Sequence, residues 1–390
     1  MKYIYIISIL IMLLSMIVIL LSIIKDRLKF IKLKKNKNDN YAILIPARDE
    51  SKVIEKLLKS IQIQNKNMNN VYVIVEDESD PTCKIVDKYN ANIFIREKPI
   101  RPRKGYALDE CLKYILKEKH YDLYFIFDAD NVLDKNFIKN MLVSWYQGYE
   151  VAIGYRNILN PVNKISCCSG ILFFILNSIV NQMKINNKRS IIVSGTGFYI
   201  SGKIIEKLNG FPFNSLTEDY EFSLFLAREN IPCMYNKKAI YYDEQPTLMS
   251  VSIKQRTRWM KGYFEARKKL VKNIKNNMSE KVGIYPYISF IIGYLFLMIS
   301  NLLYGLIFLK LSNFITFLVM LLILYIAMFL VTLYLLITEK ELNMNKKLKI
   351  KCLFYNPIFL TTYCYCFFKG LLSKDITWHK IEHVSTFKNN

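Results

Sequence analysis

The sequence predicts an α/β fold with a mostly parallel sheet, inserted between apolar segments long enough to cross a membrane. Three observations support this. Between residues 41 and 127, short and continuously apolar runs alternate with helical stretches, the pattern of a parallel sheet buried on both faces. Uncharged apolar runs cover residues 3–24, 282–309 and 314–337. The 390 residues suffice for one folded domain of ordinary size together with these segments.

The elements of the sheet domain follow one another in a regular order. Strands are expected at Tyr41–Pro46, Val71–Glu76, Asn92–Ile95 and Tyr121–Phe127. Helices are expected between them, at Glu50–Ile63, Pro81–Tyr89 and Lys104–Lys117. Ligands of open α/β sheets bind outside the carboxyl ends of the strands. The polar residues that follow these strands, among them Pro46, Arg48, Asp77 and Asp128, are therefore the first candidates for a site.

The apolar runs and the lysines beside them predict a multi-pass protein of the cell membrane. A helix rises about 1.5 Å per residue, so a helix formed by residues 3–24 is long enough to cross a hydrocarbon core of about 30 Å. A basic cluster at Lys25–Lys37 follows the run 3–24. A second basic cluster, at Lys346–Lys351, follows the run 314–337. Because such clusters mark the cytoplasmic side, we expect residues 25–281 inside the cell and the turn near Leu311–Asn313 outside. A cleaved signal peptide is the competing interpretation of 3–24, but no small-residue cleavage site precedes the lysines.

Two further apolar stretches leave alternatives open. Leu353–Leu372 contains Asn356, Pro357 and Lys369, so it is either a helix in the membrane interface or a fourth span. Ser169–Val180 is too short to span and is either an interface helix or a core helix.

The charge and the cysteines exclude other classes of protein. A net charge of +23 would suit nucleic acid, but the lysines gather beside apolar spans, where they suit anionic lipid headgroups. We therefore expect membrane lipids, and no nucleic acid, as partners. The eight cysteines contain no C-x-x-C pair of a zinc site.

Asp128-Ala129-Asp130 is a candidate metal site. In an extended chain, residues i and i+2 point the same way, so both carboxylates can share one hard cation, Mg²⁺ or Mn²⁺. The alternative is a polar turn in which Asp130 and Asn131 cap the next helix.

Two later motifs add a second group of candidates. Gln255, Arg258 and Trp259 stand at i, i+3 and i+4, so on a helix they share one face. Arg258 suits a diphosphate, whereas Trp259 is either a ring that contacts a ligand or an anchor at the membrane interface. Thr217-Glu218-Asp219 offers a carboxylate base, and its alternative is a helix cap.

These motifs together resemble the inverting family 2 glycosyltransferases. The nucleotide-sugar half of that family is matched by four segments: Tyr41–Glu50, Asp77, Lys104–Leu108 and Phe127–Asp130. The acceptor half of its membrane-embedded branch is matched by three: Ser194–Phe198, Thr217–Asp219 and Gln255-x-x-Arg258-Trp259. That branch includes the cellulose, chitin, hyaluronan and poly-N-acetylglucosamine synthases. The usual acidic pair at the second strand is here Glu76-Asp77-Glu78.

The resemblance implies a GT-A-like domain and a role for each candidate. Asp219 would be the catalytic base, and Asp128 and Asp130 the metal ligands. The donor nucleotide would be bound by Pro46, Arg48, Asp77, Lys104, Asp128 and Arg258. The acceptor would be bound by Gly195, Thr196, Gly197, Glu218, Gln255 and Trp259. Trp378-His379-Lys380 resembles a tail that returns toward the active site.

The resulting domain order is a first transmembrane helix, a basic linker, a GT-A domain, a transmembrane hairpin, an interface or fourth transmembrane helix, and a cytoplasmic tail. Their bounds are 1–24, 25–40, 41–275, 282–337, 353–372 and 373–390.

The expected function is transfer of a sugar from a UDP-sugar to a glycan acceptor at the cytoplasmic face, in polysaccharide synthesis. By resemblance alone, UDP-N-acetylglucosamine is the first donor to test and UDP-glucose the second. Single addition to a lipid-linked acceptor and an inactive membrane scaffold are the alternatives. Whether an accessory membrane subunit takes part stays open.

Overall fold

The computed structural model describes residue 10 and residues 40–65, 67–97, 103–186, 190–231, 233–271 and 285–372. The predicted first span, the basic linker and the C-terminal tail therefore lie outside the described residues, apart from residues 10 and 40.

An eight-stranded sheet organises the domain, in the order β3-β2-β1-β4-β7-β6-β8-β5. The first four strands along the chain are β1 (Tyr41–Pro46), β2 (Val71–Val75), β3 (Asn92–Ile95) and β4 (Leu123–Ile126). They are followed by β5 (Val132–Leu133), β6 (Val151–Ile158), β7 (Phe198–Ser201) and β8 (Cys233–Asp243). The four predicted strands are thus present, with ends that differ by at most two residues.

The sheet is mixed rather than mostly parallel. β3, β2, β1 and β4 pair in parallel, as the alternation of strands and helices predicts. β7 runs antiparallel to both of its neighbours, β4 and β6, and β5 runs antiparallel to β8. The reversal has a consequence for the site, because the first residue of β7, Phe198, pairs with the last residue of β4, Ile126. The loop before β7 is thereby placed beside the end of β4.

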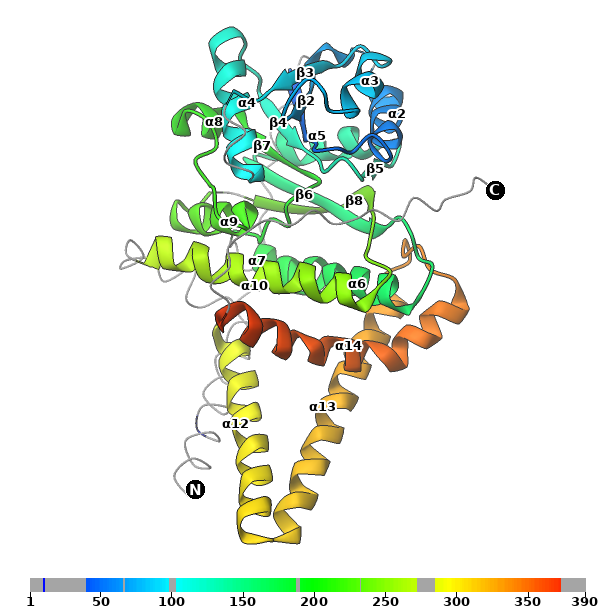
Figure 1. Ribbon diagram of the computed structural model, residues 1–390, viewed down its shortest axis with the longest axis vertical. Coiled ribbons are helices and arrows are strands. Elements are labelled where there is room, and N and C mark those ends of the chain that lie inside the picture. Colours follow the sequence, from blue (N-terminus) through cyan, green and yellow to red (C-terminus); the bar gives the residue numbers. More distant parts are fainter. Residues whose placement is uncertain are drawn as a thin grey trace.

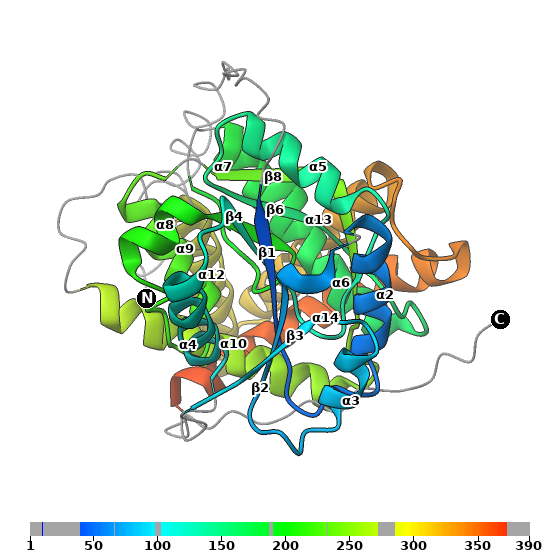
Figure 2. The ribbon, with the colours of Figure 1, turned by 90° about the horizontal axis from the view of Figure 1, so that it is seen from above.

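Helices cover both faces of the sheet, which explains the continuously apolar strands. Along β1, Ala42 and Leu44 belong to one core and Ile43 and Ile45 to the other. One core is covered by α2 (Ile54–Gln64), α3 (Thr82–Asp87) and α5 (Phe137–Tyr146). The other is covered by α4 (Lys104–Glu118), α6 (Lys164–Phe174), α8 (Gly202–Leu208) and α9 (Glu218–Arg228). Viewed from above, α2 and α3 lie on one side of β1, and α4, α8 and α9 lie on the other (Figure 2).

Beneath the sheet lies a layer of helices, and beneath that layer a long apolar hairpin (Figure 1). The layer contains α6, the π-helix η2 (Ile175–Asn181), α7 (Gln182–Asn186) and α10 (Met249–Val271), with α9 at one end. The hairpin consists of α12 (Tyr285–Phe308) and α13 (Leu311–Thr338), which pack against each other.

A short 3-10 turn, η1 (Met68–Asn70), precedes β2.

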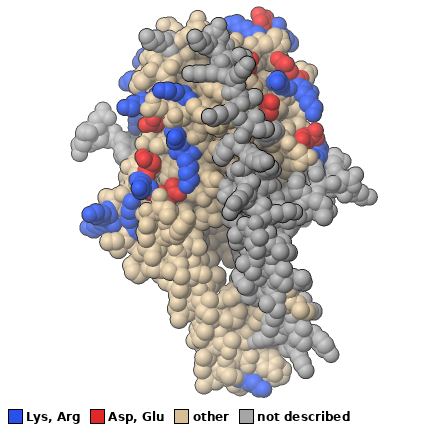
Figure 3. Space-filling model, turned by 180° about the vertical axis from the view of Figure 1, so that it is seen from behind, with Lys and Arg blue, Asp and Glu red and all other residues tan. Residues whose placement is uncertain are grey.

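Two helices of the described chain are long and apolar enough to cross a membrane: residues Lys164–Asn181 and Leu311–Thr338. The second exposes leucine and isoleucine side chains along most of its length and buries Thr332 and Leu335 near its C-terminal end. Charged side chains cover the upper domain, whereas the described surface of the hairpin is almost without them until its tip (Figure 3). The first is 56% buried and packs against β6 and α14. The core interpretation of Ser169–Val180 is therefore the one that the packing supports.

Helix α14 (Lys346–Leu372) includes the predicted segment 353–372 and starts earlier. It lies across the end of the hairpin rather than alongside it, between α13 and the layer of α6 and α10 (Figure 1). It packs against both α10 and α13. An interface helix would have this transverse orientation, and the choice between an interface helix and a fourth span stays a prediction.

Candidate active site

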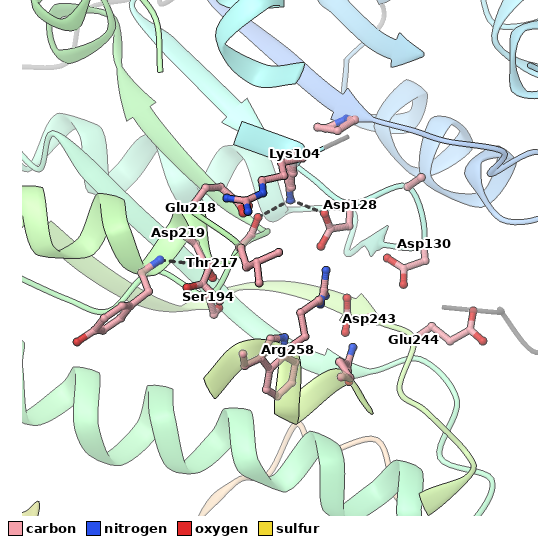
Figure 4. A pocket seen from close by; sticks show the side chains of 18 of the residues that line it. Lys104, Asp128, Asp130, Ser194, Thr217, Glu218, Asp219, Asp243, Glu244 and Arg258 are labelled. Carbon is pink, nitrogen blue, oxygen red and sulfur yellow. Dashed lines mark hydrogen bonds and ion pairs between the residues drawn. The ribbon is translucent and has the colours of Figure 1, made fainter. Parts of the chain in front are cut away.

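A cavity of about 840 Å³ opens between the carboxyl ends of the strands and the helices α4, α6, α9 and α10. Most of the residues singled out in the sequence line it. Of the predicted donor-binding residues these are Pro46, Arg48, Lys104, Asp128 and Arg258, and of the acceptor-binding residues Gly195, Glu218, Gln255 and Trp259. The predicted metal ligand Asp130 and the predicted base Asp219 also line it. Figure 4 shows the charged members of this set arranged around one common space. Residues separated by more than 200 positions are thus brought together by the fold.

Three carboxylates form a cluster at one side of the cavity. Single oxygen atoms of Asp128, Asp130 and Asp243 all lie within 4.8 Å of one another. Oxygen ligands in this arrangement fit a hard divalent cation such as Mg²⁺ or Mn²⁺. The polar-turn alternative holds in part: Ala129 and Asp130 form a turn, and the backbone N–H of Asn131 donates to the carbonyl of Asp128 at 3.1 Å. Asp130 and Asn131 do not cap a helix, because α5 begins only at Phe137.

Asp243 is a functional candidate that the sequence interpretation missed. It ends β8, and its carboxylate is buried. Arg156 donates to its Oδ2 from Nε at 3.0 Å and from Nη2 at 2.6 Å, and Asn131 donates to its Oδ1 at 2.8 Å. Burial raises the pKa of Asp243, and the guanidinium of Arg156 opposes that rise. The signal was present: Asp243 follows an apolar run, just as Asp128 does.

The loop before β7 holds Asp128 in place. The backbone N–H of Asp128 donates to Oγ1 of Thr196 at 2.8 Å, and the Thr196 hydroxyl in turn bonds to Asn131. Thr196 is fully buried and does not line the cavity, although the resemblance placed it in the acceptor site. Gly197 is also outside the lining; a Cβ on it would lie 2.2 Å from the ring of Tyr241. Thr196 and Gly197 therefore support the loop from the side that faces away from the cavity.

Lys104 connects this loop to the carboxylate cluster. It is the first residue of α4, and its ammonium group pairs with Asp128 and donates to the carbonyl of Gly195 at 2.7 Å. Burial by itself lowers the pKa of Lys104, but Asp128 and Glu218 outweigh it, so the pKa is raised. Lys104 therefore carries its charge at the N-terminal end of a helix, where two sources of positive potential favour an anionic ligand.

Glu218 and Asp219 open helix α9 on the opposite wall. Burial raises the pKa of both carboxyl groups, and the charge of Asp219 contributes to raising the pKa of Glu218 to about 7. The helix-cap interpretation holds in part: Thr217 stands at the N-cap position of α9 without a capping hydrogen bond from its hydroxyl. Oδ1 of Asp219 accepts the backbone N–H of Tyr220 in the first turn at 2.8 Å. Gly195, at φ +80°, faces Asp219: a Cβ there would stand 3.2 Å from Oδ2 of Asp219.

Gln255, Arg258 and Trp259 present one face of α10 to the cavity. The Nε atom of Arg258 is buried and has no hydrogen-bond partner among the residues that the structure describes. Glu218, Asp128 and Asp219 all contribute favourable charge interactions to this guanidinium. Burying a hydrogen-bond donor without a partner costs free energy. The Nε of Arg258 is therefore placed to donate a hydrogen bond to a ligand in the cavity. Trp259 packs edge-on against Phe173, with ring centroids 5.6 Å apart.

Asp77 is the predicted donor-binding residue that the fold does not bring into the cavity. Its side chain is exposed, and its Oδ1 accepts hydrogen bonds from the backbone N–H and the hydroxyl of Ser79. The preceding residue, Glu76, lines the cavity instead and pairs with Arg96 at 2.9 Å. Arg96 also holds Glu110 at 2.9 Å. Of the acidic run after β2, Glu76 is therefore the member that faces a ligand.

The chain resembles known proteins over the region that builds this site. Residues 38–262 match the model of a family described as "Glycosyltransferase like family 2". "Probable glycosyltransferase YdaM" of Bacillus subtilis (strain 168) is 26% identical over 234 residues, which cover 57% of this chain and 54% of that protein. The match thus spans about half the length of that relative.

A solved structure shares the fold over almost the whole chain. The mannosyltransferase PcManGT from Pyrobaculum calidifontis, in complex with GDP-Man and Mn²⁺, superposes with a TM-score of 0.60 at 13% sequence identity. The superposition covers 95% of this chain and 100% of that structure.

Proposed function

The chain belongs to the glycosyltransferase-like family 2, and we propose that it transfers a sugar, with inversion, from a nucleotide-sugar onto an acceptor hydroxyl at the cytoplasmic face of a membrane. One observation carries this proposal. A carboxylate cluster, a buried carboxylate pair and a guanidinium with a free Nε face one another across a single cavity. These are the groups needed to bind a diphosphate, accept a proton and stabilise a leaving group.

At the donor end, Asp128, Asp130 and Asp243 would hold a divalent cation, and Lys104 and Arg258 would bind the diphosphate. A bound Mg²⁺ or Mn²⁺ would supply charge to neutralise the diphosphate as it leaves. The presence of Mn²⁺ in the PcManGT complex supports this assignment. The nucleoside would lie along Pro46, Arg48 and Glu76, with Glu76 in the role that the sequence assigned to Asp77.

At the acceptor end, Asp219 would take the proton of the attacking hydroxyl. Glu218, whose pKa is raised to about 7, would tune the basicity of Asp219 through charge repulsion. Trp259 and Gln255 would contact the acceptor from α10. Thr196 and Gly197 would act through the loop that carries Gly195, not by touching the acceptor.

The identities of the donor's nucleotide and sugar are proposed from the resemblance alone. UDP-N-acetylglucosamine and then UDP-glucose remain the first candidates, while the structurally similar PcManGT was solved with GDP-Man. A donor panel must therefore include both nucleotides. The membrane location is likewise a proposal, supported by the exposed apolar surface of α13 and by the transverse position of α14.

The test is a screen of UDP-sugars and GDP-sugars on membranes that contain the protein, following release of UDP or GDP with Mn²⁺ present. We expect release from one donor and its loss in Asp219→Asn. If no donor releases nucleotide, the inactive scaffold is the correct interpretation.

A further inference from the structure

We propose that Ser223 is a positioning residue for the catalytic base: its hydroxyl ties the segment 192–195 to the first turn of α9 and thereby fixes the Asp219 carboxylate against Gly195. The inference rests on the proposed function, in which Asp219 is the base, and it concerns a residue outside the motifs of the sequence. Ser223 is buried and does not line the cavity, so it acts through other residues and not by contact with a substrate.

The segment 192–195 forms part of the cavity wall without being part of a helix or strand. Residues 190–197 precede β7 and belong to neither kind of element, yet residues 192–195 all line the cavity. The carbonyl of Gly195 accepts a hydrogen bond from the ammonium group of Lys104 at 2.7 Å. The geometry of the site therefore depends on what holds this segment in place.

Side chains from two helices hold the backbone of the segment in place of strand pairing. Asn181 of η2 donates from Nδ2 to the carbonyl of Ile192 at 2.9 Å and accepts the backbone N–H of Ile192 through Oδ1 at 2.8 Å. The next backbone N–H, that of Val193, donates to Oγ of Ser223 at 2.9 Å. The segment is thus attached to η2 by one residue and to α9 by the next.

Ser223 connects the segment to the residue that carries the base. Its hydroxyl donates to the carbonyl of Asp219, four residues earlier on α9, at 2.7 Å. A serine in a helix can donate to the carbonyl at i−4 while its oxygen still accepts a hydrogen bond from elsewhere. One hydroxyl thereby joins the backbone of Asp219 to that of Val193, which lies two residues before Gly195.

The contact between Gly195 and Asp219 gives this link its importance for catalysis. Oδ1 of Asp219 accepts the backbone N–H of Tyr220 at 2.8 Å, which leaves Oδ2 as the atom placed to take a proton. Oδ2 is also the atom that faces Gly195, where a Cβ would stand 3.2 Å away. Movement of the segment against α9 would therefore displace the carboxylate from the attacking hydroxyl, and a displacement of about 1 Å can cost about 10²-fold in rate.

The experiment measures nucleotide release at saturating donor, together with binding of UDP or GDP, whichever nucleotide the active donor contains. Ser223→Ala should lower kcat about tenfold, as expected for a displacement smaller than about 1 Å. The KM for the donor and the number of nucleotide-binding sites per protein should stay unchanged, because Lys104 keeps its pair with Asp128. Ser223→Thr keeps the hydroxyl and should retain most of the turnover.

Ser190→Ala is the matched control. Ser190 is also a buried serine that attaches the chain before β7 to α9, since its hydroxyl donates to the carbonyl of Leu226 at 3.0 Å. Leu226 lies about two turns of helix beyond Asp219, and Ser190 does not line the cavity. Ser190→Ala should therefore leave kcat unchanged.

A double variant separates positioning of the base from a general structural role. In the Asp219→Asn background, Ser223→Ala should have no further effect on the residual nucleotide release, because the group that Ser223 positions is already gone. A further tenfold loss in that background would overturn the inference.

The other outcomes are equally decisive. An unchanged kcat in Ser223→Ala, equal losses in Ser223→Ala and Ser223→Thr, an equal loss in Ser190→Ala, or loss of nucleotide binding in Ser223→Ala would each overturn the positioning role. None of these results contradicts the proposed function. That function fails instead if no donor releases nucleotide or if Asp219→Asn keeps normal turnover.

Discussion

Replacing Glu218 by glutamine tests how the buried carboxylate pair sets the pH dependence of catalysis. Burial and the charge of Asp219 raise the pKa of Glu218 to about 7, and burial also raises the pKa of Asp219. If Asp219 is the base, it acts only when ionised, so turnover must fall as the pH drops through its pKa. The variant Glu218→Gln keeps the shape of the side chain but stays neutral at every pH. Because Glu218, with its pKa of about 7, is still protonated while Asp219 ionises, the acidic limb set by Asp219 should stay in place. The change in turnover near pH 7 that accompanies ionisation of Glu218 should disappear.

The order in which the two carboxyl groups ionise follows from their surroundings. Glu218 and Asp219 are consecutive residues at the start of α9, and both are buried. The charge of Asp219 is one of the causes that raise the pKa of Glu218 to about 7, so Asp219 ionises first and Glu218 second. Each pKa unit contributed by this repulsion corresponds to about 1.4 kcal/mol of interaction between the two groups.

The assay is the pH profile of kcat, measured as nucleotide release under saturating donor for the unmodified protein and for Glu218→Gln. Glu221→Gln is a control on the same helix, outside the cavity lining, and should keep the change in turnover near pH 7. Persistence of that change in Glu218→Gln, or a displaced acidic limb, would refute the coupling. Complete loss of turnover in Glu218→Gln would show that Glu218 itself is the base.

Five other variants test the remaining assignments. Asp219→Asn should lower transfer by about 10² or more with nucleotide affinity unchanged, whereas Arg258→Ala should also weaken inhibition by the product nucleotide; equal nucleotide affinity in both variants would contradict the division of roles. Activity should require Mg²⁺ or Mn²⁺ and be abolished in Asp130→Asn, and full activity in excess chelator would exclude the metal site. Gly195→Ala places a methyl group 3.2 Å from the Asp219 carboxylate at a φ of +80°, so turnover should fall about tenfold, roughly 1.4 kcal/mol in barrier, and a normal kcat would show that the loop can yield. A cysteine introduced at Asn313 should react with an impermeant reagent from outside the cell, and protection there would reverse the proposed orientation.

Local sequence patterns determined the elements and the chemistry of the donor half. The strands β1, β2 and β4 are continuously apolar because both faces of each are buried, and this burial can be inferred from the residues of the strand alone. The carboxylates of Asp128 and Asp130 follow from their two-residue spacing at the end of a strand. The shared face of Gln255, Arg258 and Trp259 follows from helical periodicity. Each of these features depends on residues that are close together in the chain.

Only the tertiary structure decided how the two halves of the site meet. Asp243 joins Asp128 because β8 pairs with β6 at the far side of β7, a pairing that no local period specifies. The antiparallel direction of β7 places Thr196 behind Asp128 and Gly195 against Asp219. The loop that was predicted to bind the acceptor therefore also holds Asp128, a predicted metal ligand, through the hydroxyl of Thr196. Glu76 replaces Asp77 in the lining because successive residues at the end of a strand point to opposite sides. Strand order, strand direction and side-chain direction depend on contacts between distant segments, and these contacts exist only once the chain has folded.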